Sequence, residues 1–507
     1  MSKRQSWTLL IALALTLIIL RLPSFEMPLD PDSGANAFFA RQMLRGETLY
    51  GKFHPAHHLP GIYYTFEFAF RLFGDNPIAP KLLLFPWTLA CAWLIYLMGR
   101  SLFDHQTGIV GAFFFVLVSS QRWVTGMTVE MEHFANLPLI AGVFITITLL
   151  RKQAPAWQFI WVGMLGAISI LYKVTFVAPL IVAGTSILVM AWVTRGQVHS
   201  WKTMVFRLIW MAVGLVIPLV MVAAYFASLG LWERFILVFQ LGFNYVNDAQ
   251  LMGGSDLPRP FGFPLFWMSV NNIAVLIFGL FGTYRLARRA LPLRTTDHLT
   301  DFALALWLIV SFALAGMRGG GFAHYVLPVI PPLVLMAAIE INMAYQRWKT
   351  TSFKNYAVAG AGVFVALIVI NFIWANYDLY SPYLNYKLGR TSHESFLRNV
   401  SADGYASQTV TEYITAHTTP NDFIYIWSIY VDVYYYADRT PPVDILWPSY
   451  VAATGSPERI FDPHTKYIIL DTPQRMDRPQ WLLAGLAANY DLKTTLEGRE
   501  IYRRRLR

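Results

Sequence analysis

The sequence has one cysteine, Cys91, and few charged residues. A single cysteine excludes a disulfide framework within the chain, so cysteine usage does not indicate a redox compartment. Charged residues make up 14% of the 507 residues, whereas soluble domains have about 25%. Hydrophobic residues reach 56%, above the roughly 45–50% of soluble proteins. This balance excludes a water-soluble enzyme of this size, and it also excludes intrinsic disorder, which needs the opposite composition.

Internal repeats, heptads, a P-loop and a GxGxxG motif are also absent from the sequence. The net charge is +10, from 40 Lys and Arg against 30 Asp and Glu. A basic chain can bind nucleic acid, but its basic residues should then cluster on one face or stripe. Here they stand in short groups between long apolar runs, which is typical of a polytopic membrane protein. The composition therefore predicts a bilayer as partner and no nucleic acid.

Long apolar runs recur through the first three quarters of the chain. A bilayer-spanning helix needs about 20 mostly apolar residues. The first run is expected to be an uncleaved anchor, because no small-residue cleavage pattern follows it. By this measure we predict eleven transmembrane helices, over 7–22, 78–98, 107–121, 134–150, 157–171, 174–192, 207–228, 265–284, 301–316, 323–343 and 356–376.

The distribution of basic residues tests this count, because cytoplasmic loops carry an excess of Lys and Arg. With the N-terminus in the cytoplasm, every predicted cytoplasmic loop contains Lys or Arg. The predicted outer segments hold most of the loop acids and several histidines. These segments are 23–77, 122–133, 172–173, 229–264, 317–322 and the tail. We therefore predict a multi-pass protein of the cell membrane with an extracytoplasmic C-terminal domain.

Two outer segments contain elements of their own. Loop 23–77 has helical patterns from Ser33 to Gly46 and over 61–73, both rich in aromatics and expected to lie in the membrane interface. Loop 229–264 is rich in glycine and proline and is expected to be irregular near Gly253, Gly254 and Ser255.

Beyond about residue 378 the apolar runs shorten to strand length. Helices are predicted over 405–418 and 479–490, strands over 423–427 and 466–471, and a final hairpin over 491–496 and 500–505. The predicted fold is mainly α, with a transmembrane catalytic domain over 1–377 and a small α/β domain over 378–507.

Ionisable residues beside membrane spans are costly and suggest function. Eight such residues, from four loops far apart in sequence, project to the outer membrane surface: Asp30, Asp32, Glu130, Glu132, His133, Lys173, Arg318 and His324. Carboxylates and cations at one depth suit a site that removes a proton and holds a phosphate.

Four of these residues also have a structural alternative. Asp32 could cap the helix that follows it, and Asp30 could be a turn residue before Pro31. Glu132 could cap the span at 134, and Lys173 could extend from its turn to the interface. The pair His57 and His58 could bind a metal, although no ligand spacing decides it.

Loop 23–77 resembles the first outer loop of the GT-C membrane glycosyltransferases, in the branch of the protein O-mannosyltransferases and lipid A aminoarabinose transferases. The shared pattern in PLDPDSGANAFFARQMLRGETLY is an acidic motif, a helix, then a glycine and an aromatic residue. HHLPGIYY, from His57, is similar to the family's H-K-P-P-G-x-Y-Y stretch and departs from it at His58 and Leu59. Other similar elements follow in order, at Lys81, Glu130–Phe134, Ser169–Lys173, Gly321–Pro328, Phe423–Trp427 and Lys466–Asp471.

The resemblance implies inverting transfer of a sugar from a polyprenyl-phosphate donor to a hydroxyl on a lipid, glycan or protein. Asp32 aligns with the acidic motif and is expected as the base, with Asp30 and Glu132 as further catalytic acids. No cofactor is certain, and a divalent metal is possible. The side chains expected to bind the donor phosphate or substrate are Lys173, His324, Arg318, Lys81, His57 and His58.

Two other classes of function are open at this point. A transporter or flippase of lipid-linked glycans would need similar spans, but no inverted repeat is evident and the charges lie at one interface, not at the midplane. A non-catalytic scaffold could use the tail for binding, and the acid-rich first loop argues against it.

Overall fold

The computed structural model describes residues 3–193, 200–247, 262–317, 322–350, 357–451, 457–471 and 477–505. They form two compact units. Unit 1 comprises Met1–Leu22, Leu83–Tyr225 and Met252–Tyr377, and unit 2 comprises Pro23–Leu82, Phe226–Leu251 and Asp378–Arg507. The predicted domains, 1–377 and 378–507, stay a prediction, because unit 2 also includes two earlier segments of the chain.

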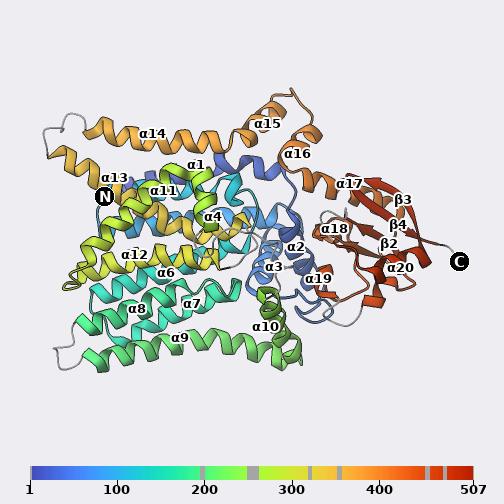
Figure 1. The fold of residues 1–507 in the computed structure, drawn as a ribbon, viewed down its shortest axis with the longest axis horizontal. Coiled ribbons are helices and arrows are strands. Elements are labelled where there is room, and N and C mark those ends of the chain that lie inside the picture. The colour runs from blue at the N-terminus through green and yellow to red at the C-terminus, as the bar shows by residue number, and fades with distance from the viewer. Residues whose placement is uncertain are drawn as a thin grey trace. The chain divides into compact units, whose positions relative to one another are not determined.

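Unit 1 is built from helices, and each of the predicted spans overlaps one of them (Figure 1). Among the described residues, seven helices are long and apolar enough to cross a membrane, or up to eight if the bent pair α14 and α15 counts as one. Helices α5, α7 and α8 are shorter, so the count of eleven stays a prediction. The helices are α1 (Lys3–Arg21), α4 (Ala79–Leu102), α5 (His105–Ser119), α6 (Met131–Arg151), α7 (Ile160–Tyr172), α8 (Ala178–Val193), α9 (Ser200–Ser228), α11 (Gly262–Ala290), α12 (Thr296–Gly316), α13 (Ile330–Lys349) and α14 (Ala357–Ala375).

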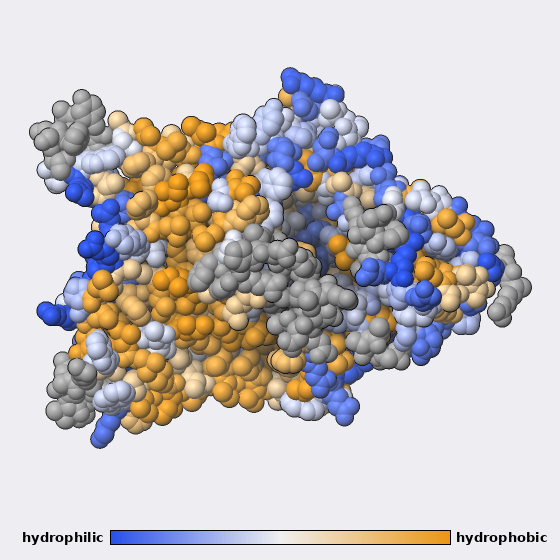
Figure 2. Space-filling model, viewed as in Figure 1, coloured by the Kyte–Doolittle hydropathy of each residue, from blue (hydrophilic) through white to orange (hydrophobic). Residues whose placement is uncertain are grey.

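The surface of these helices is broadly hydrophobic, as Figure 2 shows. Large apolar side chains such as Met221 and Trp374 are 67% and 82% exposed. Soluble proteins rarely expose contiguous apolar patches of more than a few hundred Å². The chain is therefore a multi-pass membrane protein.

Loops assigned to the same side of the membrane lie together in unit 1. Arg151, after α6, donates to the carbonyl of Ser101 at 3.4 Å and lies 3.6 Å from Asp297. At the ends assigned to the other side, the amide of Arg122 donates to the Asn376 side chain at 2.9 Å. These contacts are those expected if successive spans alternate in direction.

Unit 2 contains two helices of loop 23–77. Helix α2 (Pro31–Leu44) is mostly buried and packs on α3 (Gly61–Phe73) and α18 (Asp432–Ala437). Its apolar side chains are therefore packed inside unit 2. Helix α3 leaves Phe68 and Leu72 more than half exposed, as suits a helix in the membrane interface.

The tail forms the predicted α/β arrangement within unit 2. Its sheet has the order β1-β2-β4-β3, with β1 and β2 parallel and the other pairs antiparallel. The predicted strands and helices are confirmed, including a hairpin whose turn places Glu497 and Gly498 at φ 47° and 77°, as two-residue hairpin turns require. The elements, after α15 (Tyr377–Lys387), are α16 (His393–Val400), α17 (Ala402–His417), β1 (Phe423–Trp427), α18, α19 (Pro448–Val451), β2 (Thr465–Leu470), α20 (Gln480–Asn489), β3 (Tyr490–Leu496) and β4 (Arg499–Arg504).

Loop 229–264 contains a helix that the sequence analysis did not predict, α10 (Trp232–Asn247). Apolar Phe235, Val238 and Leu241 recur at a spacing of three residues and are buried, which favours a helix. The glycine- and proline-rich stretch that suggested irregular structure lies outside the described residues.

Three distant segments of unit 2 meet at Arg234 of α10. Its guanidinium donates to the carbonyl of Tyr50 at 2.5 Å and pairs with Asp444 at 3.0 Å. His54 donates through Nε2 to the Arg234 carbonyl at 2.7 Å, and its own amide donates to the Asp444 carbonyl. Hydrogen bonds to backbone groups and one ion pair thus connect loop 23–77, α10 and the α/β domain.

Candidate active site

The acidic motif of the first loop forms the start of α2. Asp30 is the N-cap, and its Oδ1 accepts from the Ser33 amide at 2.9 Å. The alternative in which Asp32 caps this helix is therefore wrong, because the helix begins at Pro31, two residues earlier than predicted. Asp32 lies in the first turn, where the helix dipole favours an ionised carboxylate.

Lys81 is buried at the beginning of α4, where it belongs to unit 2. Its ammonium donates to the carbonyl oxygens of Ser24 at 2.6 Å and Met27 at 2.5 Å. These bonds tie the segment before Asp30 to the start of the span. Lys81 therefore holds the backbone of this segment in place, whereas the sequence analysis expected it to bind the donor.

The two adjacent histidines lie beside aromatic residues of the α/β domain. The Tyr450 hydroxyl lies 2.7 Å from Nδ1 of His57, and the ring centroids of His57 and His58 are 4.2 Å apart. The ring of Trp447 packs against His58 at 5.4 Å. Both histidines thus belong to the joint between the first loop and the α/β domain.

A buried ion pair stands at the beginning of α6 in unit 1. The ammonium of Lys173, directly after α7, donates to Oε1 of Glu132, which lies in the first turn of α6. The two side chains are 8% and 2% exposed. Lys173 also lies 3.9 Å from the centre of the Tyr325 ring. Oε2 of Glu132 has no hydrogen-bond partner among the described residues, so one carboxylate oxygen remains available to a ligand.

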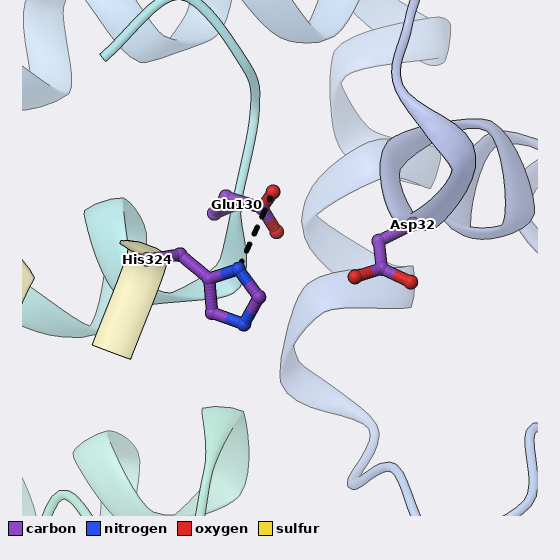
Figure 3. Close-up of side chains that lie close together, drawn as sticks. All are labelled: Asp32, Glu130 and His324. Atoms are coloured by element: carbon purple, nitrogen blue, oxygen red, sulfur yellow. Dashed lines mark ion pairs between the residues drawn. The ribbon is translucent and has the colours of Figure 1, made fainter. Parts of the chain in front are cut away.

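His324 stands between two carboxylates of the same unit. Its Nδ1 lies 3.9 Å from Oε1 of Glu130, and its Nε2 lies 4.0 Å from Oε1 of Glu132. Figure 3 draws the Glu130 and His324 side chains pointing toward each other, together with Asp32 on its helix turn. Residues from α6, the turn after α7 and the 3-10 helix Ala323–Val329 thus meet within unit 1, as their common depth predicted.

A small pocket opens beside the ion pair. Its volume is about 20 Å³, enough for roughly one water molecule. Glu132, Lys173 and Tyr325 are among its polar lining, and Leu139, Phe176 and Pro328 are among its apolar lining. Arg318, also expected at this end, lies outside the described residues.

Sequence analysis missed a buried charged group in the α/β domain. Asp432 is fully buried, and burial raises the pKa of its carboxyl to about 7, against the opposing influence of Arg499 and Ser407. Asp432 opens the short α18, which lies between predicted elements. Its sequence, DVYYYA, is typical of a buried segment, and the acid inside it was the available signal.

Comparison with solved structures shows which fold the chain has. ArnT from Cupriavidus metallidurans, bound to undecaprenyl phosphate, matches with a TM-score of 0.55 at 15% identity, covering 99% of this chain and 98% of that chain. The chain has the GT-C fold. The resemblance seen in the sequence is thereby confirmed, and the match extends over the helices and the α/β domain together.

A second GT-C protein matches as well. Archaeoglobus fulgidus oligosaccharyltransferase AglB, in complex with an inhibitory peptide and a dolichol-phosphate, has a TM-score of 0.55 at 13% identity, covering 100% of this chain and 75% of that chain. Its complex with Zn and sulfate has a TM-score of 0.53 at 14% identity, covering 98% and 73%.

Sequence comparison points the same way over part of the chain. Residues 54–229 match the family described as dolichyl-phosphate-mannose-protein mannosyltransferase. The match starts at His54 in the first outer loop and ends after α9. No curated protein sequence matches the chain.

Proposed function

We propose that this protein is an integral-membrane glycosyltransferase. It moves a sugar from a polyprenyl-phosphate donor to an acceptor hydroxyl on the extracytoplasmic side, with inversion of the anomeric carbon. The observation that carries the proposal is the full-length GT-C fold, shared with ArnT bound to undecaprenyl phosphate, together with the acids and cations of loops that the sequence predicted to be functional.

The proposed base is Asp32. Asp30 is the helix cap, and Asp32 is the other carboxylate of this turn, at the position that aligns with the acidic motif. The acceptor oxygen attacks the anomeric carbon opposite the phosphate, and Asp32 takes the hydroxyl proton. The bond from the anomeric carbon to the phosphate oxygen breaks, and the polyprenyl phosphate leaves with the electron pair.

The proposed stabilisation of the leaving phosphate comes from the Lys173 ammonium, with His324 as a neighbouring hydrogen-bond donor. Fixed cations in a water-poor site stabilise developing negative charge strongly. In the described state Lys173 is held by Glu132, so the phosphate would share the ammonium with this carboxylate. Glu132 is thus proposed to orient Lys173. Arg318, His57 and His58 are further proposed contacts for the donor.

A divalent metal is included in the proposal, with Glu130 and His324 as two of its ligands. Their donor atoms lie 3.9 Å apart, and an imidazole nitrogen and a carboxylate oxygen are both ligands that zinc accepts. When bound, the ion would supply positive charge near the reacting phosphate.

The proposed orientation places the N-terminus in the cytoplasm and the α/β domain outside, because the basic loops gather on one side of the predicted topology. The nature of the sugar, hexose or pentose, and of the acceptor is left open by this proposal.

The deciding experiment is sugar transfer by the purified protein in proteoliposomes that contain a polyprenyl-phosphate sugar. Asp32→Asn keeps the shape of the side chain and removes the base, so transfer should fall by about 10²–10⁴-fold while donor binding survives. Asp30→Asn is the matched control and should retain most of the activity. Full activity in both variants would contradict the role of this turn, and movement of intact donor across the bilayer without transfer would favour a flippase.

A further inference from the structure

Helix α18 of the α/β domain packs directly on the first turn of α2, and Figure 1 draws the two side by side. A Cβ placed on Gly34 would lie 2.2 Å from Cβ and 2.7 Å from Cα of Asp432. Ordinary contact of a Cβ begins at 3.4 Å. Only glycine therefore permits the two helices to approach this closely.

Asp432 is itself fixed by a buried chain of hydrogen bonds. The Ser407 hydroxyl on α17 donates to its Oδ1 at 3.1 Å, and Arg499 on β4 donates to Oγ of Ser407 at 3.2 Å. The three side chains are at most 2% exposed. The Arg499 guanidinium also lies 4.1 Å from the centre of the Tyr430 ring. This chain links β4 of the sheet to Oδ1 of Asp432 and so helps to determine where Asp432 stands, while its Oδ2 has no hydrogen-bond partner among the described residues.

Contacts on both sides of Gly34 continue this interface. Before it, the Leu29 amide donates to the Tyr436 hydroxyl at 2.7 Å. After it, Arg41 donates to the carbonyl of Tyr435 at 2.6 Å and lies 3.9 Å from the centre of the Tyr435 ring. The segment that carries Asp32 is thus attached to α18 before, at and after Gly34.

We infer that Gly34 and Asp432 are positioning residues, whose contact sets the place of the first turn of α2 and so of Asp32. The inference rests on the proposed function, in which Asp32 is the base. A base must lie within hydrogen-bond reach of the proton it removes, and a displacement of about 1 Å can lower a rate by about 100-fold. The α/β domain is then part of the catalytic apparatus, since Asp432, Ser407 and Arg499 all belong to it.

Gly34→Ala tests this contact directly. Moving the new Cβ from 2.2 Å to ordinary contact at 3.4 Å displaces the turn by about 1 Å, so kcat should fall by about 100-fold. The KM for the donor should stay unchanged, because the donor-binding cations are elsewhere. Gly362→Ala is the matched control. It lies on α14 with no atom within 4 Å of its added Cβ, and it should keep the kcat of the wild type.

A second pair of variants covers the case in which Gly34→Ala does not fold. Asp432→Asn keeps the volume and the acceptor oxygen for Ser407 and should retain most of kcat. Asp432→Leu introduces a side chain larger than that of aspartate and loses the acceptor, so kcat should fall by about 10-fold or more, again at constant KM. Size-exclusion chromatography and thermal unfolding identify the folded variants.

Wild-type kcat in folded Gly34→Ala or Asp432→Leu would overturn the inference, as would a raised donor KM at unchanged kcat. Different results test the proposed function and the positioning role. If Asp32→Asn loses transfer and these variants do not, only the positioning role is wrong. If the wild type transfers no sugar, the proposed function fails and the positioning role fails with it.

Discussion

The ammonium of Lys173 and the carboxylate of Glu132 form a buried ion pair between the turn after α7 and the first turn of α6. The residues are 41 positions apart in the sequence. The pair joins two spans at the end of unit 1 where His324 and Glu130 also lie.

Removing one partner of this pair should be far worse than removing both. Glu132→Gln or Lys173→Met leaves a buried charge unpaired, which typically costs about 3–5 kcal/mol. The double variant should recover most of this loss, and donor binding should stay impaired in it because the ammonium is gone. Thermal unfolding in detergent measures the coupling by a double-mutant cycle.

The exposed pair Glu67 and Arg71 on α3 is the matched control for this cycle. Surface pairs contribute about 0–1 kcal/mol, so its coupling should be small. Additive losses at Glu132 and Lys173 would contradict the view that the two charges depend on each other.

Asp30 should act through its cap. Asp30→Ala removes the acceptor for the Ser33 amide and should cost about 1 kcal/mol of stability. Asp30→Asn retains an oxygen acceptor and should lose little. Thermal unfolding of the two variants at one pH gives the comparison. Equal losses would mean that the charge of Asp30, not its cap, matters.

His54 should make the protein less stable as pH falls. Its Nε2 donates to the Arg234 carbonyl, and its Nδ1 is buried without a hydrogen-bond partner among the described residues. Burial therefore lowers its pKa from 6.5 to about 4. Between these values the unfolded chain binds a proton that the folded chain does not. Stability from this group is present above pH 6.5 and is lost progressively toward pH 4, by up to about 3 kcal/mol.

Thermal midpoints between pH 7.5 and pH 4.5 check this dependence. His54→Gln can still donate to the carbonyl and cannot titrate, so the fall in its midpoint should be shallower. His464→Gln, at a side chain that is 78% exposed, is the control and should behave as the wild type. A fall in the midpoint of His54→Gln as steep as in the wild type would assign the effect to other groups.

Substitution of the proposed metal ligands should lower the amount of bound metal ion. Protein purified with zinc and dialysed should retain metal, and Glu130→Gln and His324→Gln should retain less. Elemental analysis measures this without any assay of transfer. Glu67→Gln, an acid on α3, should not change the content. An equal metal content in the wild type and the three variants would contradict the proposed metal site.

Cysteine labelling should establish the orientation, because the native Cys91 is buried. Lys52→Cys in the first loop and Lys493→Cys on β3 should both react with a membrane-impermeant maleimide on intact cells. Lys152→Cys, after α6, should react only when the membrane is opened. Labelling of Lys152→Cys from outside would reverse the proposed orientation.

The sequence alone determined the class of this protein and much of its local structure. Spans are long, apolar and punctuated by basic loops, so hydropathy and charge locate them without knowledge of packing. The strands and helices of the tail followed from period, length and turn residues, as at Glu497 and Gly498. From their common depth in the predicted membrane spans, the sequence also predicted that Glu132, Lys173 and His324 lie together, and they do.

Only the tertiary structure decided which partner each of these side chains has. Pairing of Lys173 with Glu132, and of Lys81 with backbone carbonyls, depends on contacts between segments far apart in sequence, which local pattern does not encode. The helix boundary at Pro31 moved the cap from Asp32 to Asp30. The role of Gly34 depends on Asp432, almost 400 residues away, because the need for glycine arises from the close approach of a second helix and not from its own turn.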